Sequence, residues 1–255
     1  MPEIFGLPLD ARFAAVCAAT VVAGFLRGFV GFGAALVTIP VLSLAYDPRL
    51  AVAAMSVVGI PTLFQLLPEA IRTAERPIVV PTSLAILFAT PFGTWALVNA
   101  NPALMKIVIS SLVIAMVAML ARGWRLEREV SRHILIGAGV AGGLIQGVAG
   151  IGGPPVVAVA LSRAGSAAQQ RGNVLALMTA ISISSLIPLW YFGLFTRDAI
   201  VMGLLLLPIY GGSILLGSRY FAYGGARHFR HAAMATLALI GIATLLASIR
   251  DYFAA

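Results

Sequence analysis

The apolar positions of the chain form runs of about 20 residues, separated by short clusters of charged or turn-forming residues. A helix of this length crosses the roughly 30 Å hydrocarbon layer of a membrane. The runs do not alternate as the strands of a β-barrel do, so we predict an all-α polytopic membrane protein. The predicted single spans are residues 50–69, 78–99, 103–121, 172–195, 199–217 and 231–249.

Two further apolar stretches, residues 13–46 and 133–162, are too long for one span. A single crossing at 1.5 Å per residue needs only about 20 residues. Each stretch also contains a cluster of glycines. We therefore predict that each folds as a broken helical hairpin, and that one hairpin followed by three membrane helices makes up each half of the chain.

The two glycine clusters are copies of each other. Residues 23–40 read AGFLRGFVGFGAALVTIP and residues 142–159 read GGLIQGVAGIGGPPVVAV, so a G-x-x-G-x-G pattern recurs at an offset of 119 residues. Glycine destabilises a helix, so this density indicates that the helix is interrupted. Matching interruptions in two halves of a membrane protein indicate a transporter binding site.

The densest charged segment separates the two halves. It runs from Arg122 to Arg132 and holds four arginines and two glutamates. We predict a first repeat over residues 1–122, a charged cytoplasmic linker over 123–132 and a second repeat over 133–255, all within one transmembrane domain.

Arginine positions predict the orientation. If each hairpin returns to its starting side, one face holds 11 arginines and the other holds four. The 11 lie in the loops 70–77, 122–133, 162–171 and 218–230. Basic loops face the cytoplasm, so both termini are predicted to lie outside it, in a protein of the inner (plasma) membrane. Three crossings after each hairpin make the two repeats inverted. The count does not separate hairpins that cross the membrane fully from re-entrant ones.

Composition agrees with this picture and excludes several classes of protein. Of the 255 residues 60% are hydrophobic and 10% charged, and the mean hydropathy is +1.01, outside the range of soluble domains. The net charge of +8 fits cytoplasmic loops, so no nucleic-acid partner is expected. Cys17 has no second cysteine for a disulfide or metal site, and no P-loop is present, so no metal or cofactor is expected.

The doubled motif, GFVGFGAALVTIP and GVAGIGGPP, resembles the sulfite exporter TauE/SafE family of bacterial and archaeal membrane transporters. The resemblance covers nearly the whole chain. It implies a lipid-embedded transporter, an exporter of small anions such as sulfite, organosulfonates or related organic acids. The first copy has Ala34 and Ala35 where the second has Gly153 and Pro154, so the two breaks are expected to differ in shape.

Candidate binding residues gather at the two breaks. Arg27 is a charge within an apolar run, and its equivalent in the second copy is Gln146. Charges at membrane depth face a cavity or a partner, and helix N-termini after the breaks would offer amide hydrogens to an anion. We predict a central anion site where the breaks meet. Its residues are Arg27, Gly28, Gly31, Phe32, Gly33, Gln146, Gly147, Gly150, Gly152, Gly153 and Pro154.

Purely structural roles are the alternative for these residues. In that case Arg27 extends to the membrane interface or binds a backbone carbonyl. For the outer glycines, Gly24 and Gly143, packing between helices is the preferred role, whereas a backbone break is preferred for the inner ones. Asn173 lies close to a loop and is expected at the interface.

No carboxylate lies near the middle of a predicted span, which argues against a buried proton relay and favours export driven by the membrane potential. A non-transporting membrane scaffold is the alternative function. An intramembrane enzyme has less support, because G-x-S-x-G, H-E-x-x-H and paired membrane aspartates are missing, so the protein is not expected to be an enzyme. The oligomeric state is left open, with a homodimer as one option.

Overall fold

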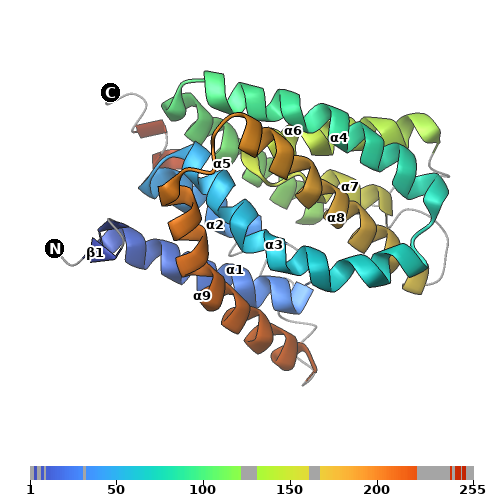
Figure 1. Cartoon of the computed structure of the whole chain (residues 1–255), viewed down its shortest axis with the longest axis horizontal. Helices are drawn as coiled ribbons and strands as arrows, with labels where there is room; N and C mark the ends of the chain where they lie inside the picture. The colour runs from blue at the N-terminus through green and yellow to red at the C-terminus, as the bar shows by residue number, and fades with distance from the viewer. Residues whose placement is uncertain are drawn as a thin grey trace. The chain divides into compact units, whose positions relative to one another are not determined.

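The computed structural model describes residues 3–4, 7–8, 10–30, 33–121, 131–160, 167–222, 242, 245–247 and 249–250. Apart from the antiparallel pair β1 (Glu3–Ile4) and β2 (Leu7–Pro8), the elements of this part are helices, which confirms the all-α class. The helices in Figure 1 are α1 (Ala11–Val30), α2 (Ala34–Ala45), α3 (Pro48–Thr73), α4 (Arg76–Asn99), α5 (Pro102–Ala121), α6 (Arg132–Ala149), α7 (Gly153–Ala160), α8 (Ala167–Tyr191) and α9 (Arg197–Ala222).

Among the described residues, five helices are long and apolar enough to cross a membrane. Four coincide with predicted single spans, and the fifth is the first arm of the predicted second hairpin. They are Arg76–Asn99, Pro102–Met119, Arg132–Ala149, Gly172–Tyr191 and Arg197–Gly217. The chain is therefore a multi-pass membrane protein. Most of the predicted span 231–249 and of the predicted linker 123–132 lies outside the described residues.

One face of α4 is both apolar and exposed. Leu84, Phe88, Phe92 and Trp95 recur every three or four residues, and Phe88 and Phe92 are 75% and 67% exposed. An apolar stripe of this kind is unfavourable in water and needs a covering. The opposite face, which includes Ile86, is buried within the protein. Lipid chains are the covering that fits the exposed stripe.

The helix ends repeat at the offset of the glycine motif. α1 ends at Val30 and α6 at Ala149, while α2 begins at Ala34 and α7 at Gly153, each pair 119 residues apart. The starts of α3 and α8 differ by the same number. Both predicted helix breaks are confirmed. The coincidence supports the repeats at 1–122 and 133–255, whose boundaries and inverted orientation stay predictions.

The returning arm of the first hairpin is short. With 12 residues, α2 rises about 18 Å, less than the roughly 30 Å of hydrocarbon, so this arm covers only part of the membrane. With 20 residues, α1 rises about 30 Å. The break after α1 therefore lies at mid-depth only if α1 is tilted or begins outside the hydrocarbon layer.

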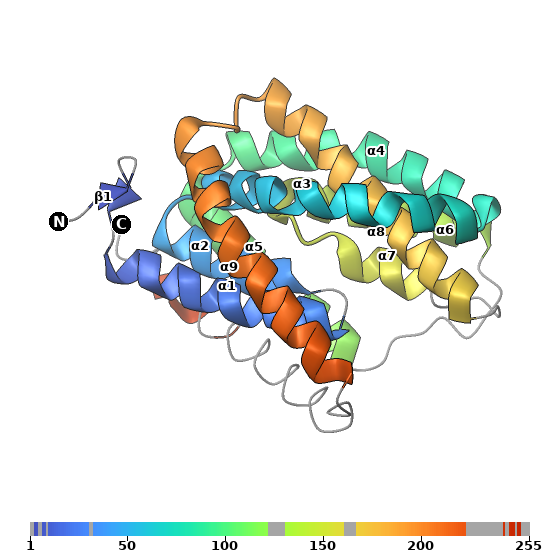
Figure 2. The same ribbon diagram turned by 60° about the horizontal axis from the view of Figure 1, so that its bottom comes forward.

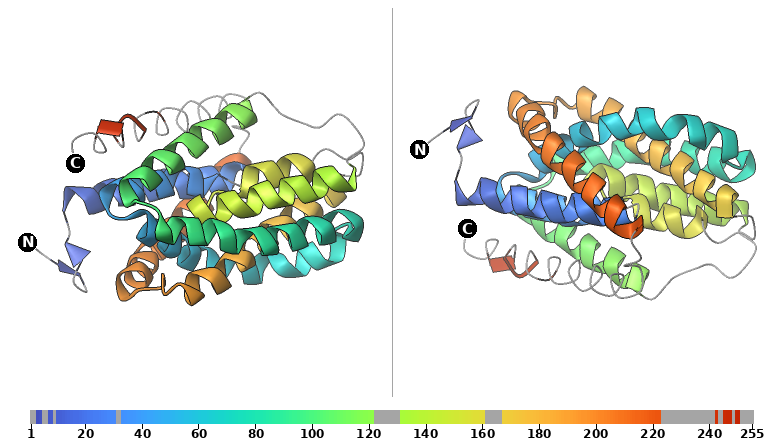
Figure 3. Two further views of the ribbon diagram at one scale, coloured as in Figure 1. Left: turned by 90° about the horizontal axis from the view of Figure 1, so that it is seen from above. Right: turned by 90° about the horizontal axis from the view of Figure 1, so that it is seen from below.

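The chain forms two compact units, and each draws helices from both predicted repeats. Unit 1 comprises Met1–Val58, Ala100–Ala118 and Gly193–Ala255, and unit 2 comprises Gly59–Asn99 and Met119–Phe192. The most extensive packing in unit 1 is between α1 and α9, which cross in Figure 2. In unit 2 it is between α4 and α6, which lie side by side in Figure 3.

Glycines bring these paired helices into backbone contact. A β-carbon on Gly143 of α6 would lie 2.7 Å from the Ile86 carbonyl oxygen of α4 and 2.9 Å from the Ala89 β-carbon. A β-carbon on Gly24 of α1 would lie 2.7 Å from the Tyr210 carbonyl oxygen of α9. The packing roles predicted for Gly24 and Gly143 are confirmed, and small residues let these membrane helices approach closely.

We predict that Gly143→Ala lowers stability by about 1–3 kcal/mol, because the added methyl group overlaps the α4 backbone. Gly137 lies on the same helix with nothing within 4 Å of its β-position, so Gly137→Ala is the control and is neutral or slightly stabilising. Thermal unfolding of the purified protein in detergent measures both. Equal melting temperatures would contradict the close packing of α4 on α6.

Candidate functional site

The first break joins α1 to α2 within unit 1. Gly33 is the N-cap of α2 and has a φ of 96°, a left-handed conformation that other residues rarely adopt. The Gly33 carbonyl oxygen accepts a hydrogen bond from the Leu36 amide at 3.1 Å. α2 packs against α1, as the predicted hairpin requires. Gly31 and Phe32, both predicted site residues, lie outside the described residues.

Arg27 lies in the last turn of α1, where the negative end of the helix dipole favours a cation. It is half-buried. Within the described part of the chain, no carboxylate pairs with Arg27 and no hydrogen bond holds it. A guanidinium group has five N–H donors and no acceptor. Arg27 therefore carries donors that no described residue uses.

The start of α2 adds further donors. The first amides of a helix have no acceptor in the preceding turn. Leu36 uses the Gly33 carbonyl, whereas the amides of Ala34 and Ala35 have no acceptor among the described residues. Together with the positive end of the α2 dipole, these amides make the break attractive to an anion.

The second break joins α6 to α7 within unit 2 and is closed by local bonds. Gly150 follows the end of α6 with a φ of 66°, and its amide donates to the Gln146 carbonyl oxygen at 2.8 Å. Pro154 and Pro155 occupy the first turn of α7. Proline has no N–H, so two of the four donors that usually open a helix are missing here.

The side chain of Gln146 makes hydrogen bonds both to this break and to α8. Its Oε1 accepts a hydrogen bond from the Gly152 amide at 3.0 Å, and its Nε2 donates to Ser185 Oγ of α8 at 2.9 Å. The Ser185 hydroxyl donates in turn to the Ile181 carbonyl oxygen of its own helix at 3.2 Å. Gln146 is only 7% exposed. The Gly152 amide, predicted to receive an anion, is thus engaged within the protein.

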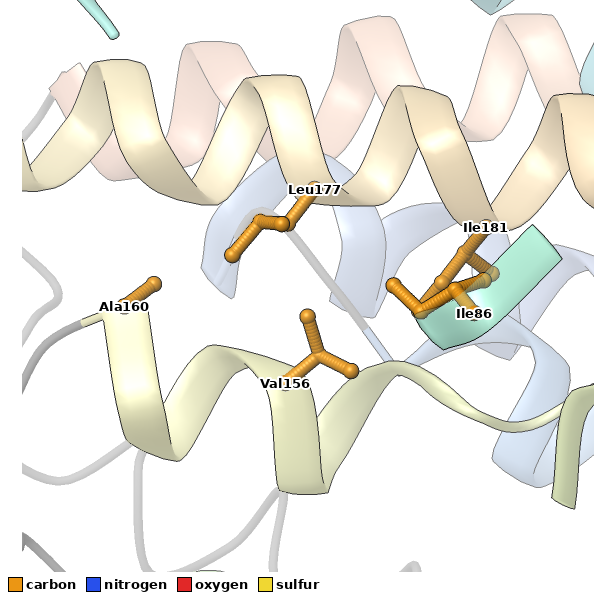
Figure 4. Close-up of a cluster of buried hydrophobic side chains, with 5 residues drawn as sticks. All are labelled: Ile86, Val156, Ala160, Leu177 and Ile181. Carbon is orange, nitrogen blue, oxygen red and sulfur yellow. The ribbon is translucent and has the colours of Figure 1, made fainter. Parts of the chain in front are cut away.

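The short helix α7 is set into an apolar cluster. Its sequence, GPPVVAVA, has no polar side chain. Val156 and Ala160 of α7 pack with Leu177 and Ile181 of α8 and with Ile86 of α4 (Figure 4). All five residues are buried, so this face of α7 stabilises the core of unit 2 and does not line a polar path.

The other predicted residues of the second break make close contacts. Gly147 lies against the Thr90 carbonyl oxygen of α4 too closely for any side chain, and Gly152 lies in the same way against the Gly142 carbonyl oxygen. These positions require glycine for packing. The binding roles of Gly28, Gly147, Gly150, Gly152, Gly153 and Pro154 stay predictions.

Asn173, expected at the interface, is buried and paired with Glu75. The Glu75 amide donates to Asn173 Oδ1 at 2.7 Å, and Asn173 Nδ2 donates to Glu75 Oε1 at 3.2 Å. Asn173 is 1% exposed. This pair fixes α8 to the start of α4, a contact that sequence reasoning missed because the two residues lie 98 positions apart.

Comparison with known proteins identifies the family. A family model described as sulfite exporter TauE/SafE matches residues 16–244, which include both helix breaks. The chain belongs to the sulfite exporter TauE/SafE family. No curated protein and no solved structure matches it. TauE/SafE proteins form a transporter family, so the lipid bilayer and a small anion are the partners that this membership implies.

In this TauE/SafE protein we predict that Gln146→Met destabilises the fold by about 1–3 kcal/mol, because the buried Gly152 amide loses its acceptor. Methionine keeps the length of the side chain, so the packing is retained. Leu144→Met, at an exposed position of the same helix, is the control. Thermal unfolding without added anion measures both variants. A wild-type melting temperature for Gln146→Met would contradict the role given to this amide.

Proposed function

We propose that the protein exports small anions, such as sulfite, organosulfonates or related organic acids, across the inner membrane. The observation that carries the proposal is the family match over residues 16–244. In this proposal the two repeats are inverted, both termini lie outside the cytoplasm, and the substrate binds at the broken helices.

The donors at the first break support an anionic substrate. Arg27 presents a planar guanidinium that binds two oxygens of one oxyanion at once. The amides of Ala34 and Ala35 offer further N–H groups without adding an acceptor. A site of this kind binds an acceptor-rich anion and repels cations.

The membrane potential supplies the driving force for export. An anion that leaves a negative-inside cell gains roughly 2.3 kcal/mol per charge per 100 mV. Transport out of the cell therefore proceeds without a carboxylate relay inside the protein. Facilitated export through alternating access is the simplest mechanism that fits these features.

We predict that Arg27→Gln lowers sulfite flux from proteoliposomes by about tenfold or more, because a hydrogen bond to a charged group contributes roughly 1.5–3 kcal/mol. Arg12→Gln is the control, since Arg12 is an exposed arginine at the other end of the same helix. Both variants are compared at equal amounts of folded protein.

Wild-type flux in the Arg27→Gln variant would contradict the proposed site and favour an arginine that only reaches the membrane interface. A wild-type protein that moves none of sulfite, sulfonates, sulfate and simple carboxylates would contradict transport itself. A scaffold protein would give that second result.

A further inference from the structure

The two breaks share one sequence pattern but differ in their hydrogen bonding. In the second break, Gln146 Oε1 accepts the hydrogen of the Gly152 amide. The equivalent residue of the first break is Arg27, whose side chain has no acceptor atom. Gln146 therefore occupies one amide of the second break, which Arg27 cannot do in the first.

Thr38 of α2 adds a donor that the fold does not use. It has no exposed surface, and its Oγ1 has no hydrogen-bond partner. A buried hydroxyl in a helix ordinarily bonds the carbonyl four residues back, as Thr20 does to Val16 at 2.8 Å. The same bond is made by Thr82, Thr90, Thr94, Thr179 and Ser213. Thr38 departs from this pattern, as do Ser43 and Ser110. A buried hydroxyl left unpaired is destabilising unless a ligand completes it.

Helix geometry directs Thr38 toward the break. Side chains of a helix tilt toward its N-terminus, so a residue covers the turn that begins four positions earlier. Thr38 therefore lies over Ala34, whose amide has no acceptor among the described residues. α2 packs against α1. Arg27 lies three residues before Val30, the last residue of α1, and Thr38 lies four residues after Ala34, the first residue of α2, so both belong to the helical turns that flank the first break.

We propose that the transported anion binds at the first break alone, held by the Arg27 guanidinium, the amides of Ala34 and Ala35 and the Thr38 hydroxyl. This rests on the proposed function. The donors come from four groups, namely one guanidinium, two amides and one hydroxyl, so they match an SO₃ group, with three acceptor oxygens, better than a carboxylate, with two.

The second break then has a structural role. Gln146 places a neutral amide oxygen on the Gly152 amide, where an anion would otherwise bind. Thr38 is fully buried in this structure, so an anion reaches it only when α2 moves away from the groups that cover it.

The test compares Thr38→Val with the matched control Thr20→Val, a buried threonine of the same unit whose hydroxyl is already bonded. Sulfite, methanesulfonate and acetate are titrated into each purified protein, and affinity is measured calorimetrically. The last two probes carry equal charge and differ in their oxygen count. Thr38→Ala removes the hydroxyl together with the methyl group, and Thr38→Ser keeps the hydroxyl.

We expect Thr38→Val to bind sulfite and methanesulfonate about tenfold to a hundredfold more weakly, and acetate with less than a threefold change. Thr20→Val and Thr38→Ser keep wild-type affinities, and Thr38→Val melts no lower than wild type without anion. The inference is overturned if Thr38→Val and Thr38→Ala bind sulfite like wild type, or if all three probes weaken equally. A wild-type protein that binds none of the three anions contradicts the proposed function instead.

Discussion

A polypeptide in hydrocarbon must satisfy its backbone amides and carbonyls from within, because lipid offers no hydrogen bonds. A regular helix does this automatically, but each interruption of a helix exposes amides at the start of the next segment. The part of this chain that the structure describes has two such interruptions, at equivalent places in α1–α2 and α6–α7. The groups that accept the exposed amide hydrogens of each interruption decide whether it can bind a solute.

In the second interruption, prolines and a glutamine side chain reduce the number of unsatisfied amides. Two prolines remove amide hydrogens, and Gln146 accepts the hydrogen of Gly152 while donating to Ser185. The first interruption has neither prolines at these positions nor the glutamine. An arginine replaces the glutamine, and two alanines replace the glycine and proline that open α7. In our proposal, the duplicated motif thus gives one turn that Gln146 holds and one that a negatively charged solute completes.

Close glycine packing supports both turns. In unit 2, Gly139 and Gly143 of α6 place the helix directly against carbonyl oxygens of α4. In unit 1, Gly24 of α1 and Gly217 of α9 make the corresponding approach. Each interrupted helix is therefore fixed to a long helix from the other predicted repeat. Rigid neighbours of this kind hold the broken segment in place while its free groups remain available.

Sequence reasoning located the breaks because so many glycines within one apolar run are incompatible with a stable, unbroken helix. Both predicted interruptions lie where α1 gives way to α2 and α6 to α7. The same reasoning expected the two breaks to differ in shape, because Ala34 and Ala35 stand where the second copy has Gly153 and Pro154, but it did not foresee the bonds of Gln146. An amide side chain is both donor and acceptor, so its partners depend on the fold and not on its position in a motif.

Thr38 was missed although the sequence held a signal for it. It is a polar residue four positions after the start of a helix whose first turns are otherwise apolar. What the sequence does not reveal is that its hydroxyl lacks the usual backbone bond. The pair of Asn173 and Glu75 was missed for a different reason, since only the tertiary fold brings these distant positions together.

Anomalous scattering from selenite, a heavier analogue of sulfite, tests the account most directly. Crystals of the wild-type protein grown with selenite would locate the bound anion from the selenium signal. The account requires a peak at the start of α2, within hydrogen-bonding distance of Arg27 and Thr38. A peak at the start of α7, or density confined to the loop arginines, would contradict it.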